Sequence, residues 1–283
     1  MSFLSGLSAL STSFLTLGLS ASLSSVALAQ TSFPDVPSDY WAEPFINRLA
    51  QRNIIAGYPD GTFRPEQAVQ RDEFAAMIRQ AFDQEPVREI ESGSAYEDVP
   101  EGYWAEQPIE EAAQQGFMSG DAGGNFRPNQ PMSRVEALTT LVRGLNLAPR
   151  TAQTNTRRAT RRPIYLPLAV TSLMQPIVAA RPATPPVTTP VAEPLAETVR
   201  EYYTDADQIP DSAIPYVGIA TQRNLVVNHP DLRVLNPNEP LRRATAAAFI
   251  HQSLVAQDRI EPLPSNVAAY NYIVRPEISQ AAR

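Results

Sequence analysis

The sequence of 283 residues contains no cysteine, no lysine and only two histidines, His229 and His251. Without cysteine the chain cannot form disulfide bonds, thiolate metal sites, a cysteine nucleophile or a lipidated cysteine. Two histidines also leave little material for a zinc site or a histidine-based catalytic triad. We therefore expect a non-catalytic protein with no cofactor and no metal site. Because every basic side chain is arginine, cationic contacts with a ligand have to come from arginine, which can bind a carboxylate through two parallel hydrogen bonds.

Charged side chains are also absent from residues 1–29, which end in Ala27-Leu28-Ala29. A short apolar run closed by an Ala-x-Ala site is typical of a secretory signal peptide. The alternative is an uncleaved membrane anchor, but the apolar core is short and rich in serine, so we predict cleavage and export to the cell envelope. Farther along, the best candidate span, residues 164–180, is interrupted by two prolines, and we expect no transmembrane segment in the mature chain.

Acidic and basic residues are unevenly distributed along the rest of the chain. Residues 30–136 contain 19 acidic and 8 basic side chains, whereas residues 137–192 contain seven arginines and no acid. Residues 193–283 contain 11 acidic and 8 basic side chains, and the formal net charge of the whole chain is −7. This acidic excess argues against nucleic acid as the main ligand, while the basic strip could lie on an anionic surface.

One sequence motif occurs twice between Phe33 and Leu147, with an offset of 63 residues. A repeated unit usually buries its apolar face against neighbouring copies, so the repeat predicts the architecture. The matched pairs are Asp35 and Asp98, Trp41 and Trp104, Gly57 and Gly120, Arg71 and Arg134, and Glu73 and Glu136.

Each copy is expected to fold into two helices joined by a loop. From Trp41, apolar residues recur at i+4, i+5 and i+8, and from Phe74 they recur at i+3, i+4, i+7 and i+8, which is the spacing of one helical face. Residues 58–61, Tyr-Pro-Asp-Gly, predict a tight turn between the helices, because a calcium loop would need several more oxygen ligands. In the second copy, Ser133 and Glu136 have the spacing of a helix capping box.

A more divergent third copy begins near Tyr203. Asp205 and Arg243 take the places of the first-copy aspartate and arginine, and Thr245 replaces the glutamate. The segment before this copy is rich in proline and is expected to be largely extended. The predicted organisation is a signal peptide at 1–29, repeats at 33–84, 96–147 and 203–256, a Pro/Arg-rich linker or insertion at 148–200, and a tail at 257–283 docked through Tyr270, Tyr272 and Ile273.

The repeats resemble the S-layer homology motifs of bacterial cell-envelope proteins. The matching residues of the first copy are Phe33-Pro34-Asp35-Val36, Tyr40-Trp41-Ala42, the loop of residues 57–65 and the tetrapeptide of residues 70–73, which corresponds to Thr-Arg-Ala-Glu in the family. The resemblance implies a mainly α fold, in which three helix-loop-helix repeats pack as a pseudo-threefold unit around a central helical bundle. With its signal peptide and proline-rich insertion, the chain resembles envelope proteins of cyanobacteria.

The same resemblance implies that grooves between the repeats bind a cell-wall glycopolymer, either a secondary wall polysaccharide or a polymer linked to peptidoglycan. The tetrapeptide arginine is the principal ligand contact of the family, and its positions here are Arg71, Arg134 and Arg243. The family's glutamate is present as Glu73 and Glu136 but is missing from the third copy, so binding is least expected from the third groove.

The residues themselves leave two interpretations of these arginines open. An arginine at the start of a helix adds its donors to the free N–H groups of the helix end, a combination that suits a carboxylate or a phosphate. In the alternative, the arginines pair with Glu73, Glu136 or the adjacent acidic surface and have only a structural role.

The repeated tryptophans and aspartates have the same ambiguity. Trp41 and Trp104 could stack on a sugar ring, but their place at the start of an apolar helical stripe favours core packing. Asp35 and Asp98 precede the first helix, where bracing of a loop is expected more than direct contact with a ligand.

Two functions are consistent with these observations. The first is a non-catalytic envelope protein that binds wall polymer through the grooves, with avidity from several weak sites. The alternative is a structural or protein-interaction scaffold of the envelope, whose Pro/Arg-rich insertion contacts another envelope protein or an anionic surface. A wall hydrolase would need a defined pair of carboxylates, and nothing selects one pair among the many acids. The assigned segments leave no room for a further domain, so we expect any cargo to be a separate protein.

Overall fold

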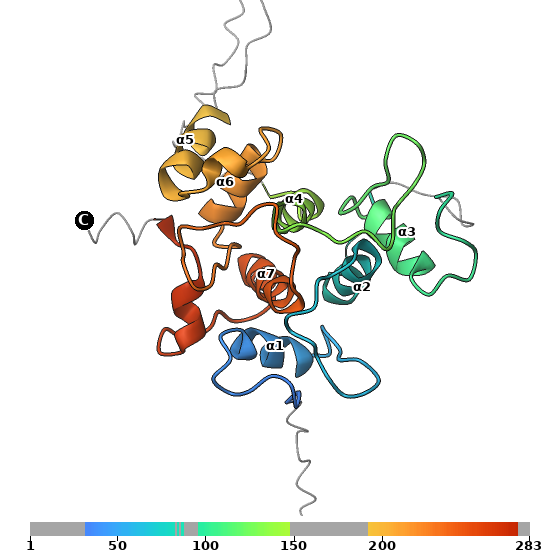
Figure 1. The fold of residues 1–283 in the computed structure, drawn as a ribbon, viewed down its shortest axis with the longest axis horizontal. Coiled ribbons are helices and arrows are strands. Elements are labelled where there is room, and N and C mark those ends of the chain that lie inside the picture. The colour runs from blue at the N-terminus through green and yellow to red at the C-terminus, as the bar shows by residue number, and fades with distance from the viewer. Residues whose placement is uncertain (1–31, 83, 85, 88–95, 148–191, 277–283) are drawn as a thin grey trace, which may run out of the picture. The chain divides into compact units, whose positions relative to one another are not determined.

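The computed structural model describes residues 32–82, 84, 86–87, 96–147 and 192–276, and this part of the chain is mainly helical (Figure 1). The predicted signal peptide and most of the predicted linker lie outside the described residues. Each repeat contributes a first helix and a longer second helix, as predicted. The first helices are α1 (Glu43–Ala50), α3 (Glu106–Gln114) and α6 (Ile214–Gln222), and the second helices are α2 (Arg71–Ala81), α4 (Arg134–Gly144) and α7 (Arg243–Ala256).

The three repeats pack on one another in a closed cycle. α3 packs on α2, α6 packs on α4, and α1 packs on α7, so each first helix lies against the second helix of a neighbouring repeat. α7 also contacts α2 and α4, and these second helices form the central bundle (Figure 1). The contact between α1 and α7 joins the first repeat to the third and completes the cycle. The predicted packing of three repeats around a central helical bundle is thereby confirmed.

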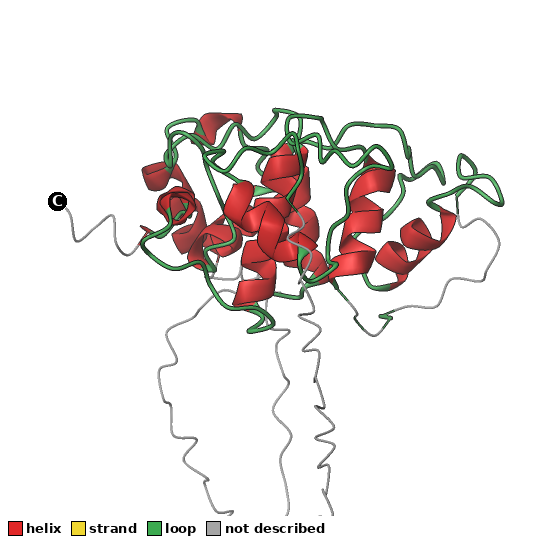
Figure 2. Ribbon diagram, turned by 90° about the horizontal axis from the view of Figure 1, so that it is seen from below, coloured by secondary structure: helices red, strands yellow, loops and turns green. Residues whose placement is uncertain are grey.

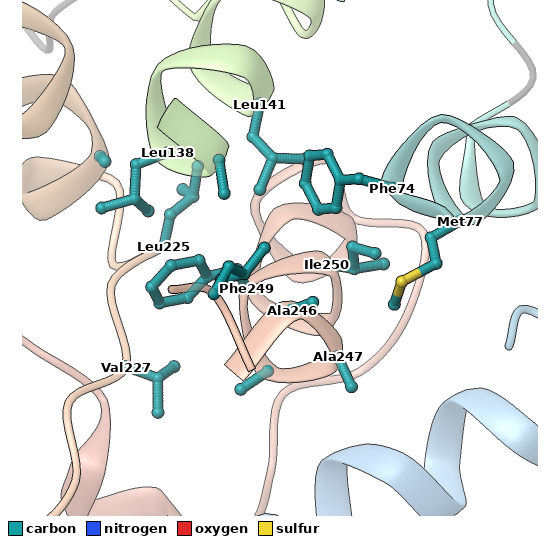
Figure 3. Packing of buried hydrophobic residues seen from close by; sticks show 14 of the residues in the cluster. Phe74, Met77, Leu138, Leu141, Leu225, Val227, Ala246, Ala247, Phe249 and Ile250 are labelled. Atoms are coloured by element: carbon teal, nitrogen blue, oxygen red, sulfur yellow. The ribbon is translucent and has the colours of Figure 1, made fainter. Parts of the chain in front are cut away.

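Apolar side chains from all three second helices hold the bundle together. Phe74 of α2, Leu141 of α4 and Ile250 of α7 gather in one region of contact (Figure 3), and each is fully buried. In α7 every residue from Arg243 to Leu254 is buried, which explains why this helix lacks the polar stripe of a surface helix. Burying one large apolar side chain contributes roughly 1.5–3 kcal/mol. The repeat that diverges most in sequence is therefore the centre of the structure.

Backbone hydrogen bonds link the loop segments that precede the second helices. The N–H of Val69 donates to the carbonyl oxygen of Leu241 (2.8 Å), that of Leu241 donates to Met132 (2.7 Å), and that of Met132 donates back to Val69 (3.0 Å). These residues occupy equivalent positions in the three repeats, and all are buried. Because buried N–H and C=O groups need partners, each repeat requires both of the others to complete this triangle.

The first amide groups of the second helices are used in the same way. In α4, the N–H of Arg134 donates to the carbonyl oxygen of Glu239 and the next amide donates to Pro237, both at 3.0 Å, and α2 and α7 make equivalent bonds. The expectation that these amides are free for a ligand is wrong, because the loop of the adjacent repeat occupies each helix end. The predicted capping box is confirmed, since the Glu136 carboxylate accepts the N–H of Ser133 at 2.8 Å and the Ser133 hydroxyl accepts the N–H of Glu136.

Two further segments cover the outer sides of first helices. α5 (Ala192–Tyr202) falls at the end of the predicted linker and packs on α6, with Leu195 next to Gly218. The C-terminal tail crosses α1, where Arg48 donates to backbone carbonyl oxygens of residues 261 and 262, and continues into the 3-10 helix η2 (Ala268–Tyr272). The predicted docking of the tail is confirmed by a β-bridge between Ile273 and Val227. Among the described helices, none has the length and apolar character needed to cross a membrane.

Candidate ligand-binding groove

The repeat aspartates brace the loops that lie between the repeats. Figure 2 shows that much of the loop chain runs along one side of the helices. Asp35 accepts the N–H groups of Phe63 (2.8 Å) and Arg64 (2.6 Å) through its two carboxylate oxygens. Asp98 and Asp205 hold the equivalent loop residues in the same way, at 2.6–2.9 Å. Arg64 has a φ of 57°, a conformation that few residues other than glycine adopt, and the aspartate stabilises it.

The three tetrapeptide arginines each bridge two repeats. Each occupies the first position of a second helix, and its Nε–H donates to a loop carbonyl of the neighbouring repeat at 2.7–2.8 Å. The acceptor carbonyls belong to the same loop residues that the aspartates hold through their N–H groups. The arginines therefore stabilise the contact between repeats, whatever else they bind. The pairs are Arg71 with Phe126, Arg134 with Leu235, and Arg243 with Phe63.

A carboxylate from the next repeat acts on two of these arginines. Burial lowers the pKa of Arg71, and the negative charge of Glu136 opposes that shift. Burial also lowers the pKa of Arg243, against the influence of Tyr58 and Glu73, and this arginine is only 7% exposed. The Glu73 carboxylate accepts a hydrogen bond from the Tyr58 hydroxyl at 2.8 Å. In these two sites the protein itself supplies the negative charge that the guanidinium requires.

Arg134 differs from the other two because it faces Thr245 instead of a carboxylate. The Thr245 hydroxyl accepts from Nη1 at 3.3 Å, and the Asn228 side-chain oxygen accepts from Nη2 at 2.7 Å. Burial lowers the pKa of Arg134 to about 10, so the guanidinium keeps its charge at neutral pH. Within the described part of the chain its hydrogen-bond acceptors are all neutral, as are those of Arg71 and Arg243, and the charges of Asp205 and Glu239 oppose the pKa shift. The substitution of the family's glutamate by Thr245 thus changes the surroundings of Arg134, the arginine of the second repeat.

A groove of about 850 Å³ lies beside Arg134. Its walls come from the first repeat, the third repeat and the C-terminal tail. Arg242 contributes a second cation and forms an ion pair with Glu66 at 2.7 Å, in which both side chains are more than half exposed. An ion pair this exposed contributes little to stability and leaves Arg242 free to rearrange towards a ligand.

One side of this groove consists of three rings from distant parts of the chain, Trp41, His229 and Tyr272, which we call the ring cluster. The Trp41 and His229 rings are stacked, with centroids 5.1 Å apart and planes at 8°. The Tyr272 ring packs edge-on against His229, with centroids 4.6 Å apart. Trp41 is consequently half-buried. Its equivalent in the second repeat, Trp104, is 59% exposed, so the prediction of core packing is wrong for Trp104.

The surface beside Trp104 has carboxylates at two helix positions that are uncharged in the groove. Tyr103 donates its hydroxyl to Asp72 at 2.6 Å, and the residue after Asp72 is also a carboxylate. Burial raises the pKa of Asp72, and the hydrogen bond from Tyr103 opposes this shift. In α7 the equivalent positions are Ala244 and Thr245, which carry no charge. The groove has carboxylates of its own, Asp39, Glu66 and Glu239, so the two surfaces differ at these two helix positions and not in the presence of acid.

Sequence analysis identified the arginines but missed the residues that distinguish their sites. His229, Asn228 and Tyr272 lie outside the repeat signature, and only the cyclic packing brings them to Arg134. In the sequence alone, Thr245 indicates that the third repeat has lost a contact of its own. The sequence does not show that each tetrapeptide arginine faces the following repeat, so that Thr245 changes the site of Arg134. Within the residues that the structure describes, no group of three or more histidine and acidic side chains could hold a metal ion.

Comparison with known proteins agrees with the three repeats. The model of the S-layer homology domain family matches residues 32–75, 95–138 and 202–247. The third match includes the divergent copy, together with the arginine and threonine at positions 243 and 245.

Several cell-surface proteins share this part of the chain. The chain is 32% identical over 122 residues to a cellulosome-anchoring protein of Acetivibrio thermocellus, which is 42% of this chain and 27% of that protein. It is 34% identical over 125 residues to an S-layer protein of Bacillus licheniformis, covering 44% of this chain and 14% of the relative. It is 38% identical over 91 residues to the outer membrane protein SlpA of Deinococcus radiodurans, covering 31% of this chain and 8% of the relative. The chain thus spans 27% or less of the length of these relatives. The chain thus contains three S-layer homology domains.

Proposed function

We propose that the chain is a non-catalytic anchoring protein that binds an acidic cell-wall glycopolymer in the groove beside Arg134. Its domains and its relatives, which include a cellulosome-anchoring protein, support attachment to the cell wall. The observation that carries the finer proposal is that Arg134 lines the groove and faces Thr245, at the position where Glu136 acts on Arg71 and Glu73 acts on Arg243. An acidic sugar of a wall polysaccharide, or of a polymer linked to peptidoglycan, would supply the missing negative charge.

The other walls of the groove also suit a sugar. Arg242 adds a second cation, and the ring cluster provides apolar ring faces with polar edges, which match the mixed surface of a carbohydrate. A hydrogen bond to a charged group contributes about 1.5–3 kcal/mol, so one or two such contacts give modest affinity. A polymer that carries many copies of the same sugar compensates for this, because it raises the local concentration of ligand.

Among the residues predicted to contact the wall polymer, we place Arg134 and Trp41 at the ligand. Trp104 is accessible, but its neighbour Tyr103 contacts Asp72, where the equivalent position at the groove is the uncharged Ala244. The remaining residues are proposed to hold the loops and repeats together. They are Arg71, Arg243, Glu73, Glu136, Asp35 and Asp98.

Thr245→Glu tests this proposal, because it places a carboxylate against Arg134 as Glu136 and Glu73 do for the other arginines. The variant is expected to fold normally, since the same residue type occupies this position in the first two repeats. Sedimentation with purified, protein-free wall sacculi should weaken about tenfold or more, which corresponds to one charged hydrogen bond. Thr245→Val is the matched control, because it keeps the shape without the charge, and it should bind nearly as well as the parent chain.

Undiminished binding by Thr245→Glu would contradict the assignment of the site. Binding that survives chemical removal of the attached polysaccharide would instead identify peptidoglycan itself as the ligand. The alternative scaffold function depends on the Pro/Arg-rich insertion, which lies outside the described residues, and it predicts that both Thr245 variants behave like the parent.

A further inference from the structure

The ring cluster is built by parts of the chain that do not belong to the repeat signature. His229 follows Asn228, whose backbone N–H donates to the carbonyl oxygen of Tyr272 at 2.9 Å. The Asn228 side chain accepts from Arg134 at 2.7 Å. One short segment therefore holds the groove arginine, fixes the tail and presents the His229 ring.

The His229 ring is held in place by its faces and is open at its edge. Stacking on Trp41 and edge-on packing by Tyr272 fix the plane of the ring. His229 is nevertheless exposed, and neither ring nitrogen has a hydrogen-bond partner among the described residues. A ring that is oriented by packing but keeps free nitrogens at the wall of a groove is arranged to contact a ligand, since an imidazole can donate or accept there.

Charged and titratable groups of several elements face the same groove. They are Asp39 and Tyr40 before α1, Glu66 of the first-repeat loop, Arg134 of α4, Glu239 and Arg242 of the third-repeat loop, and Tyr272 of the tail. Burial lowers the pKa of His229 below its usual 6.5, and the charge of Glu66 opposes this shift. The imidazole is therefore mainly neutral at pH 7–8, and only solution more acidic than its usual pKa converts it to a cation.

We propose that His229 is a ligand-contact residue that makes the groove bind its acidic sugar more tightly as the pH falls. This inference rests on the proposed function and adds the regulation of the same site. A protonated imidazole donates from both nitrogens and adds a third cation beside Arg134 and Arg242. Binding of an anion there favours the protonated form, and by linkage protonation favours binding to the same extent.

The test compares sedimentation of the full chain with polysaccharide-bearing sacculi at pH 5.5 and pH 8.0. Sugar carboxylates stay ionised at both values, because carboxyl groups titrate near pH 3–4. The parent chain should bind about three- to tenfold more tightly at pH 5.5, as expected if binding shifts the pKa of one group by up to about one unit. His229→Phe keeps a ring against Trp41 but cannot be protonated, and it should bind equally at both pH values with the affinity that the parent has at pH 8.0.

The outcomes separate this inference from the proposed function. A parent chain that binds equally at both pH values, or a His229→Phe chain that keeps the full pH effect, would overturn the role of His229 and leave the groove intact. Absence of binding by the parent at either pH would overturn the proposed function itself. Circular dichroism checks that each variant is folded. If His229→Phe does not fold, His229→Gln replaces it, because glutamine keeps hydrogen bonding without the charge.

Discussion

The surfaces around Trp41 and Trp104 come from the same motif but differ in packing and charge. Trp41 is half-buried in the ring cluster beside two arginines, whereas Trp104 is 59% exposed beside the buried Asp72. Nothing in the two repeat sequences produces this difference, because both contain the same Tyr-Trp-Ala segment. The rings that cover Trp41 come from a loop of the third repeat and from the tail. The loop of the third repeat and the tail, which lie outside the motif, therefore form a groove at one of two equivalent surfaces.

The three arginine sites also differ because of residues that other repeats contribute. The tetrapeptide glutamate of the next repeat acts on Arg71 and Arg243, whereas Arg134 faces Thr245 at that position and is influenced by Asp205 and Glu239 instead. A departure from the family tetrapeptide thus removes a negative charge from a site at the edge of the groove. Under our proposal, the missing glutamate of the third repeat contributes to ligand binding, whereas the sequence alone predicts that its absence weakens the third groove.

Replacing each tryptophan by alanine should separate the two surfaces most strongly. Trp41→Ala removes packing against His229 and Tyr272 and should lower the free energy of unfolding by about 2–3 kcal/mol. Trp104→Ala removes an exposed ring and should change it by less than about 0.5 kcal/mol. Urea unfolding followed by circular dichroism measures both values. Equal losses would show that the two environments are alike and would contradict the comparison.

The two histidines should respond differently to acid, because His251 lies in the core of α7 and His229 lies on the groove. Burial lowers the pKa of His251 to about 4, against the hydrogen bond to Gln252. Between about pH 4 and 6.5 the unfolded chain binds a proton at this position that the folded chain does not, so stability rises with pH in this window. His251 should therefore cost about 2 kcal/mol of stability at pH 5 relative to pH 8.

Urea unfolding at the two pH values tests this effect, with His251→Gln as the control for all other titrating groups. The parent chain should lose more stability on acidification than the variant does. An equal loss in both chains would show that His251 can be protonated without unfolding. This measurement also separates acid effects on stability from the acid effect on binding that we assign to His229.

Loss of Arg242 should affect binding more than folding. Its ion pair with Glu66 is exposed, so Arg242→Ala should change the free energy of unfolding by less than about 0.5 kcal/mol. Sedimentation with sacculi should weaken about three- to tenfold, because one cation of the groove is lost. Arg127→Ala is the matched control, since Arg127 forms a similar exposed pair with Asp121 in the second repeat. A control that weakens binding as much as Arg242→Ala would indicate a diffuse charge effect.

Deletion of residues 150–188 should have the smallest effect. This deletion removes most of the basic strip and stops before α5, which packs on α6. If the groove is the binding site, sedimentation with sacculi should be unchanged. Loss of binding by the deleted chain would favour the scaffold function, in which the insertion makes the contact.

The fold was largely predictable from the sequence, and the site was predictable only in part. Repeat spacing, helical periodicity and the capping box are local signals, and they correctly predicted the helices of each repeat. The partners of Arg134 could not be predicted, because they depend on cyclic packing between segments about 100 residues apart. Nor could the ring cluster, since Trp41 meets His229 and Tyr272 only after the tail docks. The helix-end amides looked free because a single repeat contains no partner for them.

The most direct test of the account is to follow the three arginine Nε–H groups by NMR during titration with acidic oligosaccharides released from the wall. Arg71 and Arg243 are internal controls, because Arg134 lines the groove and these two arginines are not among its lining residues. We predict a saturable shift of the Arg134 signal, with little change in the other two. Equal shifts of all three signals, or a shift that excludes Arg134, would contradict the claim that the groove arginine of the second repeat binds the wall polymer.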